Sequence, residues 1–190
     1  MGINPINLTG NWDEGYVLDQ HVLSSVPIGE DVYGHMQFST TRSELGELLY
    51  LFKYKGRYDC LQNIMELVKP FLDSWKALKT VDIILPVPSS KPRSYQPANE
   101  IANAISDYLN ISVSDEVLKK TTSEQSKNMD RSQKHLEGSI IALKKAIKPH
   151  TILLVDDLYS TGETLNECVR VLREDENLKK IYVLAMTKTR

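Results

Sequence analysis

The sequence predicts an α/β fold in which a mostly parallel sheet is flanked by helices. Three short apolar runs without polar alternation, at residues 81–85, 151–155 and 181–185, are typical of strands that are covered on both faces. Between these runs, apolar residues recur at intervals of three and four positions, which predicts helices with one apolar face each. Buried strands that alternate with such helices favour a parallel sheet over a purely helical or purely β arrangement.

Composition sets the limits of this fold and of its partners. A chain of 190 residues with 41% hydrophobic residues predicts one domain with a small elaboration. The net charge of −2 gives no overall attraction to nucleic acid or to an anionic membrane, so we expect neither as a direct partner. Cys60 and Cys168 lie far apart on apolar helix faces and are expected to be core residues. The absence of a signal-like segment or a long apolar run predicts a cytoplasmic protein.

The first 42 residues differ in character from the rest of the chain. They are rich in glycine, serine and β-forming residues, and they predict a small β-rich N-terminal cover, or hood, over a core at residues 43–190. Strands near residues 16–23 and 32–39 are expected to pair with each other around a turn at residues 27–31. Aromatic side chains here could stack on a flat ligand ring, although packing in the core is the favoured interpretation for each of them. They are Trp12, Tyr16 and Tyr33.

Helices are predicted from residue 43 onward. Ser43 or Thr41 can cap the first helix, which is expected to end near Gly56. A second helix begins near Tyr58, and Pro70 is expected to kink or split it. Pro97 suits the first turn of a third helix.

The stretch from residue 151 to residue 164 carries the clearest functional signal. A buried strand runs into Asp156 and Asp157, and a turn at residues 160–164 with a central glycine then leads into an amphipathic helix. Free amides at a helix start bind phosphate well, and open α/β sheets bind ligands at the carboxyl ends of their strands. Two carboxylates beside such a turn suit a sugar phosphate, because sugar hydroxyls donate to carboxylates and a divalent cation offsets the remaining charge. A receiver domain is excluded, since only 33 residues follow Asp157.

Residues 155–164 closely resemble the phosphoribosyl pyrophosphate (PRPP) signature of the type I phosphoribosyltransferases. Further landmarks follow the order found in the ComF-type members of that family, which are named for a role in DNA uptake. These landmarks are Lys53-Tyr54 with Gly56, residues 86–88 with Lys91 and Arg93, and Thr122, Gln125 and Arg131. Two features depart from the ComF pattern: the N-terminal four-cysteine zinc ribbon is absent, and residues 93–97 replace an Arg-Gly-Phe-Asn-Gln stretch.

The resemblance implies a type I phosphoribosyltransferase-like fold and transfer of ribose 5-phosphate from PRPP, with Mg²⁺ as cofactor. It assigns the 5-phosphate to Tyr159, Ser160, Thr161, Gly162, Glu163 and Thr164. It assigns the ribose hydroxyls, the positive charge of the transition state and Mg²⁺, directly or through PRPP and water, to Asp156 and Asp157. It assigns pyrophosphate to Ser89, Ser90, Lys91, Lys53 and Lys55. A polar loop at residues 119–135 is expected to act as a lid that supplies Lys119, Lys120 and Arg131.

Several questions stay open on the sequence alone. The acceptor is an unidentified base or amine, and the hood is the expected place to find its specificity. A PRPP-binding regulator without turnover and a ComF-like accessory protein of DNA uptake are alternatives to the enzyme. A homodimer is compatible with the sequence.

Overall fold

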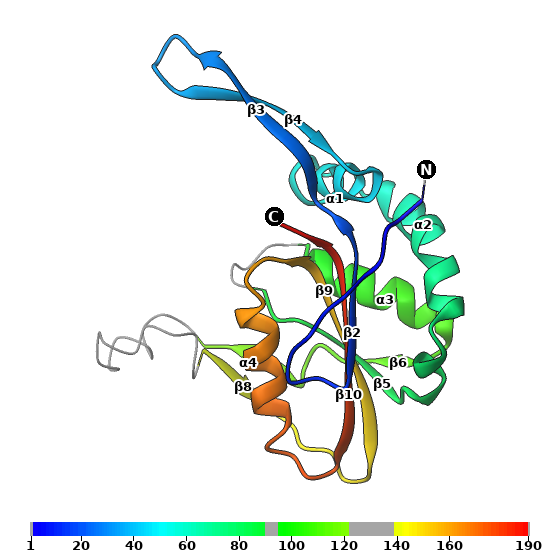
Figure 1. Cartoon of the computed structure of the whole chain (residues 1–190). Coiled ribbons are helices and arrows are strands. Elements are labelled where there is room, and N and C mark those ends of the chain that lie inside the picture. Colours follow the sequence, from blue (N-terminus) through cyan, green and yellow to red (C-terminus); the bar gives the residue numbers. More distant parts are fainter. Residues whose placement is uncertain (1, 90–94, 122–138, 190) are drawn as a thin grey trace, which may run out of the picture.

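The computed structural model describes residues 2–89, 95–121 and 139–189, and its centre is a six-stranded sheet (Figure 1). The strand order is β1-β2-β10-β9-β5-β6, and every neighbouring pair is parallel except β1 with β2. The bounds are β1 Ile6–Asn7, β2 Glu14–Gln20, β5 Ile83–Pro86, β6 Ser112–Val113, β9 His150–Tyr159 and β10 Leu178–Lys188. The predicted α/β fold with a mostly parallel sheet is therefore confirmed.

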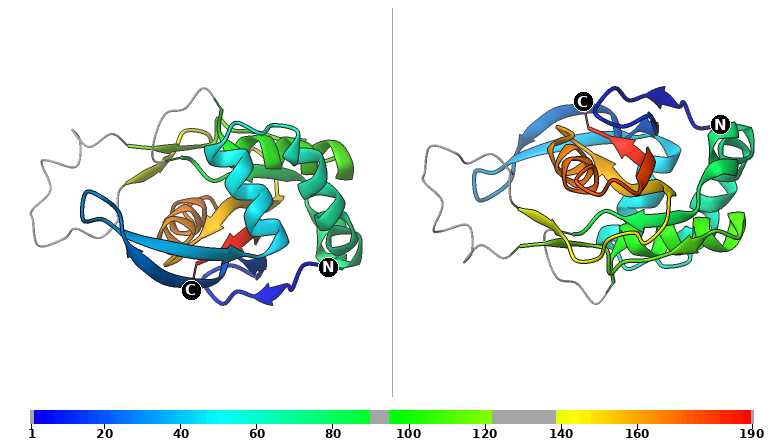
Figure 2. Two further views of the ribbon diagram at one scale, coloured as in Figure 1. Left: turned by 90° about the horizontal axis from the view of Figure 1, so that it is seen from above. Right: turned by 90° about the horizontal axis from the view of Figure 1, so that it is seen from below.

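Helices cover both faces of this sheet (Figures 1 and 2). On one face, α1 (Glu44–Tyr54), α2 (Cys60–Ser74) and α3 (Pro97–Leu109) bury their apolar stripes against Leu153 and Val155 of β9. On the other face, α4 (Glu163–Leu172) packs on Ile152 and Leu154. Successive residues of a strand point to opposite faces, so β9 needs an uninterrupted apolar run to contact both layers.

Local signals in the sequence account for the starts of the helices. The Ser43 hydroxyl accepts a hydrogen bond from the Gly46 amide at 3.0 Å and so caps α1 as predicted. Pro97 occupies the first turn of α3, also as predicted. The predicted split of the second helix is wrong, because α2 continues unbroken through Pro70. The apolar stripe of α2 is buried on both sides of the proline, and this packing outweighs the loss of one backbone hydrogen bond.

The N-terminal 42 residues form two different structures. Strand β2 lies inside the central sheet beside β10, with Val17 and Leu18 fully buried on its two faces. The predicted pairing of residues 16–23 with residues 32–39 is therefore wrong. Instead, β3 (Val22–Glu30) pairs with β4 (Met36–Arg42) in an antiparallel ribbon that projects away from the body (Figure 1). Figure 2 shows this ribbon, here called the arm (residues 22–42), on the same side of the molecule as α4.

A second short ribbon lies beside α4. It consists of β7 (Leu118–Lys120) and β8 (Ile140–Ala142), which are antiparallel. Leu118 and Ile140 are buried in the same apolar cluster as α4, so they hold the ribbon against that helix. A short 3₁₀ turn, η1 (Lys76–Thr80), links α2 to the strand β5. Each free cysteine is buried, Cys60 on α2 and Cys168 on α4, as expected for core residues.

Candidate functional site

The two polar turns predicted at the strand ends lie side by side. Strand β5 is hydrogen-bonded to β9 in parallel, and the pairing reaches the residue after β5, where the Val87 amide donates to the Val155 carbonyl at 2.9 Å. Parallel neighbours end at the same edge of a sheet. Ser89 after β5 and the acidic pair of β9 therefore lie on one edge of the sheet.

Strand β9 extends further than the apolar run predicted. Its backbone pairs with β10 through Asp156, Leu158 and Tyr159, so both acids belong to the strand. Alternation along the strand places Asp157 toward α1 and Asp156 toward α4. The two side chains thus point toward opposite faces of the sheet.

The predicted turn between strand and helix follows directly after β9. Ser160 and Thr161 lead to Gly162, which has a positive φ of 81° and precedes the first residue of α4. An added Cβ at Gly162 would lie 2.5 Å from the Tyr159 hydroxyl, so both the backbone angle and the close approach of the ring require glycine. The turn encloses a small cavity of about 60 Å³. The cavity is lined by Asp156 and residues 158–165, which include every residue predicted to hold the 5-phosphate.

The Asp157 carboxylate makes an ion pair with α1. Lys53 Nζ, in the last turn of that helix, lies 2.6 Å from Asp157 Oδ2, and the two side chains are only 19% and 15% exposed. The Asp157 amide also donates to Asp156 Oδ1 at 2.9 Å. Lys53 is therefore held beside the acidic pair.

The second acid, Asp156, has an unusual electrostatic environment. Burial raises the pKa of Asp156 well above the usual range of a carboxyl group, and the neighbouring Asp157 raises it further. The amide of Asp157 and the charge of Lys53 act in the opposite direction. An acid that resists ionisation in the unliganded protein can become fully ionised when a cation or a developing positive charge is placed beside it.

A larger cavity of about 300 Å³ adjoins the turn between β9 and α4. It shares Asp156, Leu158 and Thr164 with the smaller cavity, so the two cavities lie next to each other at the same edge of the sheet. Its remaining lining residues come from α1, the turn after β5, the start of α3 and β9. They are Lys53, Tyr54, Val87, Pro88, Ser89, Gln96, Pro97, Ala98 and Asp157.

Other predicted residues lie elsewhere or outside the described part of the chain. Lys55 caps α1 and places its Nζ 5.7 Å from the centre of the Tyr50 ring, and it does not line the cavity. Lys119 and Lys120 are on β7, beside α4. Burial raises the pKa of the Cys168 thiol on α4, and the charge of Lys120 acts in the opposite direction. Several predicted residues, and most of the predicted lid loop, lie outside the described residues: Ser90, Lys91, Arg93, Thr122, Gln125 and Arg131.

One residue near the acidic pair, His21, was not predicted from the sequence to lie there. His21, directly after β2, is half-buried and its Nδ1 lies 3.0 Å from the Thr187 hydroxyl. Burial lowers the pKa of His21, and Arg42 and Lys53 lower it further, while Asp157 raises it. His21 thus belongs to the electrostatic surroundings of the acidic pair. A single histidine in a β-rich segment gives no signal of this, because only the pairing of β2 with β10 brings it there.

The aromatic residues of the N-terminal segment are not gathered at the site. Trp12 is buried and donates from its indole to the Leu8 carbonyl at 2.8 Å. Tyr16 packs edge-on against Phe71 and Trp75. Core packing, the favoured interpretation for both residues, is therefore confirmed, whereas Tyr33 is 81% exposed at the tip of the arm.

The described residues contain no group of three or more His, Cys, Asp or Glu side chains that could hold a metal ion. Asp156 and Asp157 fit a divalent cation only if oxygen atoms of a substrate and of water complete its coordination, which is the usual arrangement for Mg²⁺. Within the same part of the chain, no helix is long and apolar enough to cross a membrane.

Comparison with known proteins adds independent information. A family model described as "phosphoribosyl transferase domain" matches residues 59–188. No curated protein sequence matches the chain. Among solved structures, adenine phosphoribosyltransferase aligns with 14% identity and a TM-score of 0.49, over 88% of this chain and 86% of that one. UMP synthase of Leishmania donovani aligns with 18% identity and a TM-score of 0.40, over 83% of this chain but only 27% of that one.

Proposed function

The chain belongs to the phosphoribosyl transferase domain family, and from this premise we propose that it transfers ribose 5-phosphate from PRPP to a base or amine and releases pyrophosphate. One observation carries the proposal. Two carboxylates, a lysine and a glycine-containing turn at a helix start line two adjacent cavities at the carboxyl ends of the parallel strands. That combination provides for a phosphate, a ribose and a pyrophosphate in one extended site.

The 5-phosphate is assigned to the turn between β9 and α4. Amides at the start of α4 and the hydroxyls of Ser160, Thr161 and Thr164 provide donors, and the helix dipole favours the negative charge. Glu163 contributes its amide, and its carboxylate must point away from the phosphate. Tyr159 packs on Gly162 and shapes the wall of the cavity.

The ribose is assigned to the acidic pair. Asp156 and Asp157 accept hydrogen bonds from its hydroxyls, and their charge stabilises the positive charge that develops at the anomeric carbon as the bond to pyrophosphate breaks. The raised pKa of Asp156 makes its ionised form most favourable when that positive charge appears. No covalent intermediate with the protein is needed, because positioned charge and the exclusion of water are sufficient.

Pyrophosphate is assigned to the larger cavity, near Ser89 and Lys53. Mg²⁺, held by the acidic pair together with substrate and water oxygens, would offset the negative charge of the leaving group. Lys119, Lys120 and Arg131 remain proposed lid residues, and Ser90 and Lys91 remain proposed pyrophosphate ligands. Lys55 is the weakest of the proposed pyrophosphate contacts, because its ammonium group faces Tyr50.

The finer assignments rest on sequence alone. The order of the landmarks supports a ComF-type protein, and a cytoplasmic location remains a prediction from the hydrophobicity pattern of the sequence. The acceptor is unassigned, and residues 1–42 are proposed as the part that selects it. Since Trp12 and Tyr16 pack in the core, a base cannot stack on them without local rearrangement.

A pyrophosphate-release assay with Mg²⁺-PRPP and a panel of purines, pyrimidines and simple amines tests the proposal. We expect release with at least one acceptor, and loss of release in the Asp157→Asn variant. The surface variant Asp107→Asn, on α3, is the matched control. Tight binding of PRPP without release for any acceptor would instead support a PRPP-binding regulator.

A further inference from the structure

The arm, residues 22–42, exposes an unusual amount of apolar surface for its size. Within the described residues, it carries seven of the thirteen large apolar side chains that are exposed: Leu23, Val26, Ile28, Val32, Tyr33, Met36 and Phe38. Their exposed fractions range from 46% to 92%.

The arm also lacks the features that keep a ribbon stable and solvated. A two-stranded hairpin alone is marginally stable in water, and three or more strands are normally required. Its 21 residues include only three side chains of the Asp, Glu, Lys and Arg types, namely Glu30, Asp31 and Arg42, and no lysine. Apart from its base near α1, the arm projects from the body, and no helix or strand of the described residues lies over it (Figure 1).

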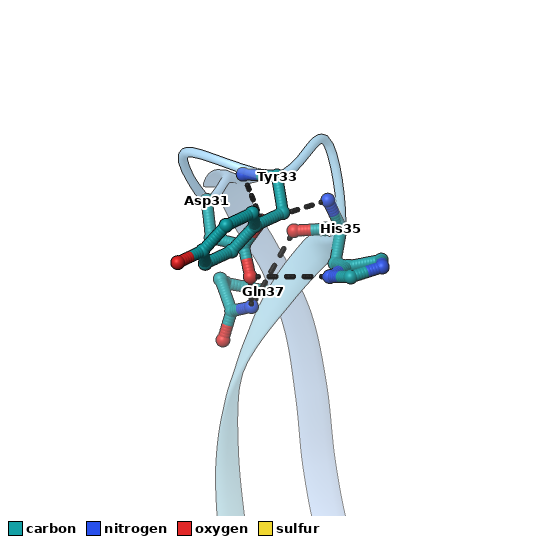
Figure 3. Close-up of polar contacts among 4 residues, drawn as sticks. All are labelled: Asp31, Tyr33, His35 and Gln37. Atoms are coloured by element: carbon teal, nitrogen blue, oxygen red, sulfur yellow. Dashed lines mark hydrogen bonds and ion pairs between the residues drawn. The ribbon is translucent and has the colours of Figure 1, made fainter.

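The tip of the arm is nevertheless well defined (Figure 3). The Asp31 carboxylate accepts from the Tyr33 and His35 amides, each at 2.9 Å, and from Gln37 Nε2 at 3.1 Å. His35 Nδ1 lies 3.4 Å from the same carboxylate. These contacts fix a tight turn that presents Val32 and Tyr33 outward. A constrained turn with apolar residues outside is more typical of a contact surface than of a solvated loop.

The two edges of the arm differ in a way that selects one for pairing. Strand β3 contains Pro27 and Gly29, and its register with β4 shifts twice, between Val22 and Ser24 and between Pro27 and Gly29. Proline and bulges are devices that prevent an edge strand from pairing. Strand β4 has neither proline nor glycine, and Phe38, Thr40 and Thr41 favour strand structure. Among the described residues β4 pairs only with β3, so its outer edge can accept a further strand.

We propose that β4 pairs with β4 of a second copy of this chain, in antiparallel orientation, to form the four-stranded sheet β3-β4-β4-β3. A second copy fits for two reasons. A twofold arrangement of one edge with itself satisfies the backbone groups of both strands. The low charge of the arm causes little repulsion between copies.

The antiparallel pairing has a geometric consequence. The tip of each arm points toward the base of its partner's arm, so Val32 and Tyr33 approach the partner's body near the start of α1. The proposed assembly is tested by mass and cross-linking, whereas PRPP transfer is tested by pyrophosphate release, so failure of one proposal can be told apart from failure of the other.

Sedimentation velocity of the full chain between about 0.5 and 50 μM tests the proposal. We expect twice the chain mass of 21.6 kDa. Phe38→Lys places two lysines in the interface, one from each copy, and should raise the dissociation constant of the dimer by roughly 30-fold or more. Ile147→Lys, at a residue that is 97% exposed outside the arm, adds the same charge and should leave the dimer intact.

Cysteine cross-linking identifies the surface directly. Single cysteines at each position from residue 37 to residue 41 should give an intermolecular disulfide at the position nearest the twofold axis, because only that residue lies opposite its own copy. Both native cysteines are buried and do not compete. A monomer at 50 μM would overturn the proposal. So would a dimer that survives Phe38→Lys and cross-links at none of these positions, because it must use another surface.

Discussion

Replacing Gly162 with alanine tests the turn between β9 and α4, at residues 160–164, because this turn depends on the glycine in two separable ways. A positive φ of 81° costs an alanine about 1–2 kcal/mol. Its Cβ would also lie 2.5 Å from the Tyr159 hydroxyl and 2.9 Å from two ring carbons, so the ring must move at a cost of about 1 kcal/mol. Reduced freedom of the unfolded chain offsets about 0.4–1 kcal/mol. The net loss of folding free energy is therefore about 2 kcal/mol.

Thermal unfolding and PRPP binding measure the two consequences. A loss of about 2 kcal/mol should lower Tm by roughly 4–8 °C in a chain of this size. Binding of PRPP should weaken at least about tenfold, because the displaced ring and the altered turn disturb the amides that would face the phosphate.

Gly56 provides the matched control. It also has a positive φ, of 64°, but an added Cβ there meets no atom within 4 Å. Gly56→Ala should therefore show the backbone cost alone, with Tm lowered by no more than about 4 °C and PRPP binding unchanged. The double variant Tyr159→Ala, Gly162→Ala removes the contact between the two side chains. Its loss of folding free energy should be about 1 kcal/mol smaller than the sum of the losses in the two single variants. Equal effects of the two single glycine variants on stability and binding would refute the reasoning.

Three further predictions concern the acidic pair and the capping of α1. Lys53→Met leaves a mostly buried Asp157 carboxylate without its ion pair, and should lower the free energy of unfolding by about 1–3 kcal/mol in denaturant titration, whereas Lys55→Met should be neutral. Asp156→Asn should stabilise the protein by about 1–2 kcal/mol at pH 8 while weakening PRPP binding. A carboxyl group whose pKa is raised in the folded protein takes up a proton on folding. Its destabilising effect therefore grows as the pH rises from the ordinary pKa of the group to the raised pKa. Equal Tm values of the wild type and the variant at pH 8 would contradict this. Ser43→Ala should cost about 1 kcal/mol through loss of the cap to the Gly46 amide, with PRPP binding retained, and a Tm shift below about 1 °C would argue against the cap.

The parts of the fold that the sequence predicts well are those with local signals. The apolar run of β9, the glycine of the turn and the apolar face of α4 lie within about 25 consecutive residues, so strand, turn and helix follow from one another. The proximity of Ser89 to the acidic pair follows from a general rule, because parallel strands end at the same edge of a sheet.

What the sequence did not predict depends on distant pairings. Strand β2 joins the sheet through β10, more than 160 residues away, and no local pattern shows which strand edges meet. The position of His21 beside Thr187 follows from that pairing and was missed with it. Strand β9 continues through Asp156 and Asp157, although aspartate is disfavoured in strands, because backbone pairing with β10 holds it there.

Equilibrium binding of PRPP in the presence of Mg²⁺ is the most direct test of the central claim, that the edge formed by β9, the turn and α4 is a PRPP site. Isothermal titration of the wild-type chain should show one site per chain. The double variant Asp156→Asn, Asp157→Asn should weaken that binding by roughly 100-fold or more, because both carboxylates that face the ribose and the cation are lost. The thermal unfolding of the double variant should remain cooperative, which shows that the fold is retained. Unchanged affinity in a folded double variant, or no binding by the wild type, would contradict the account.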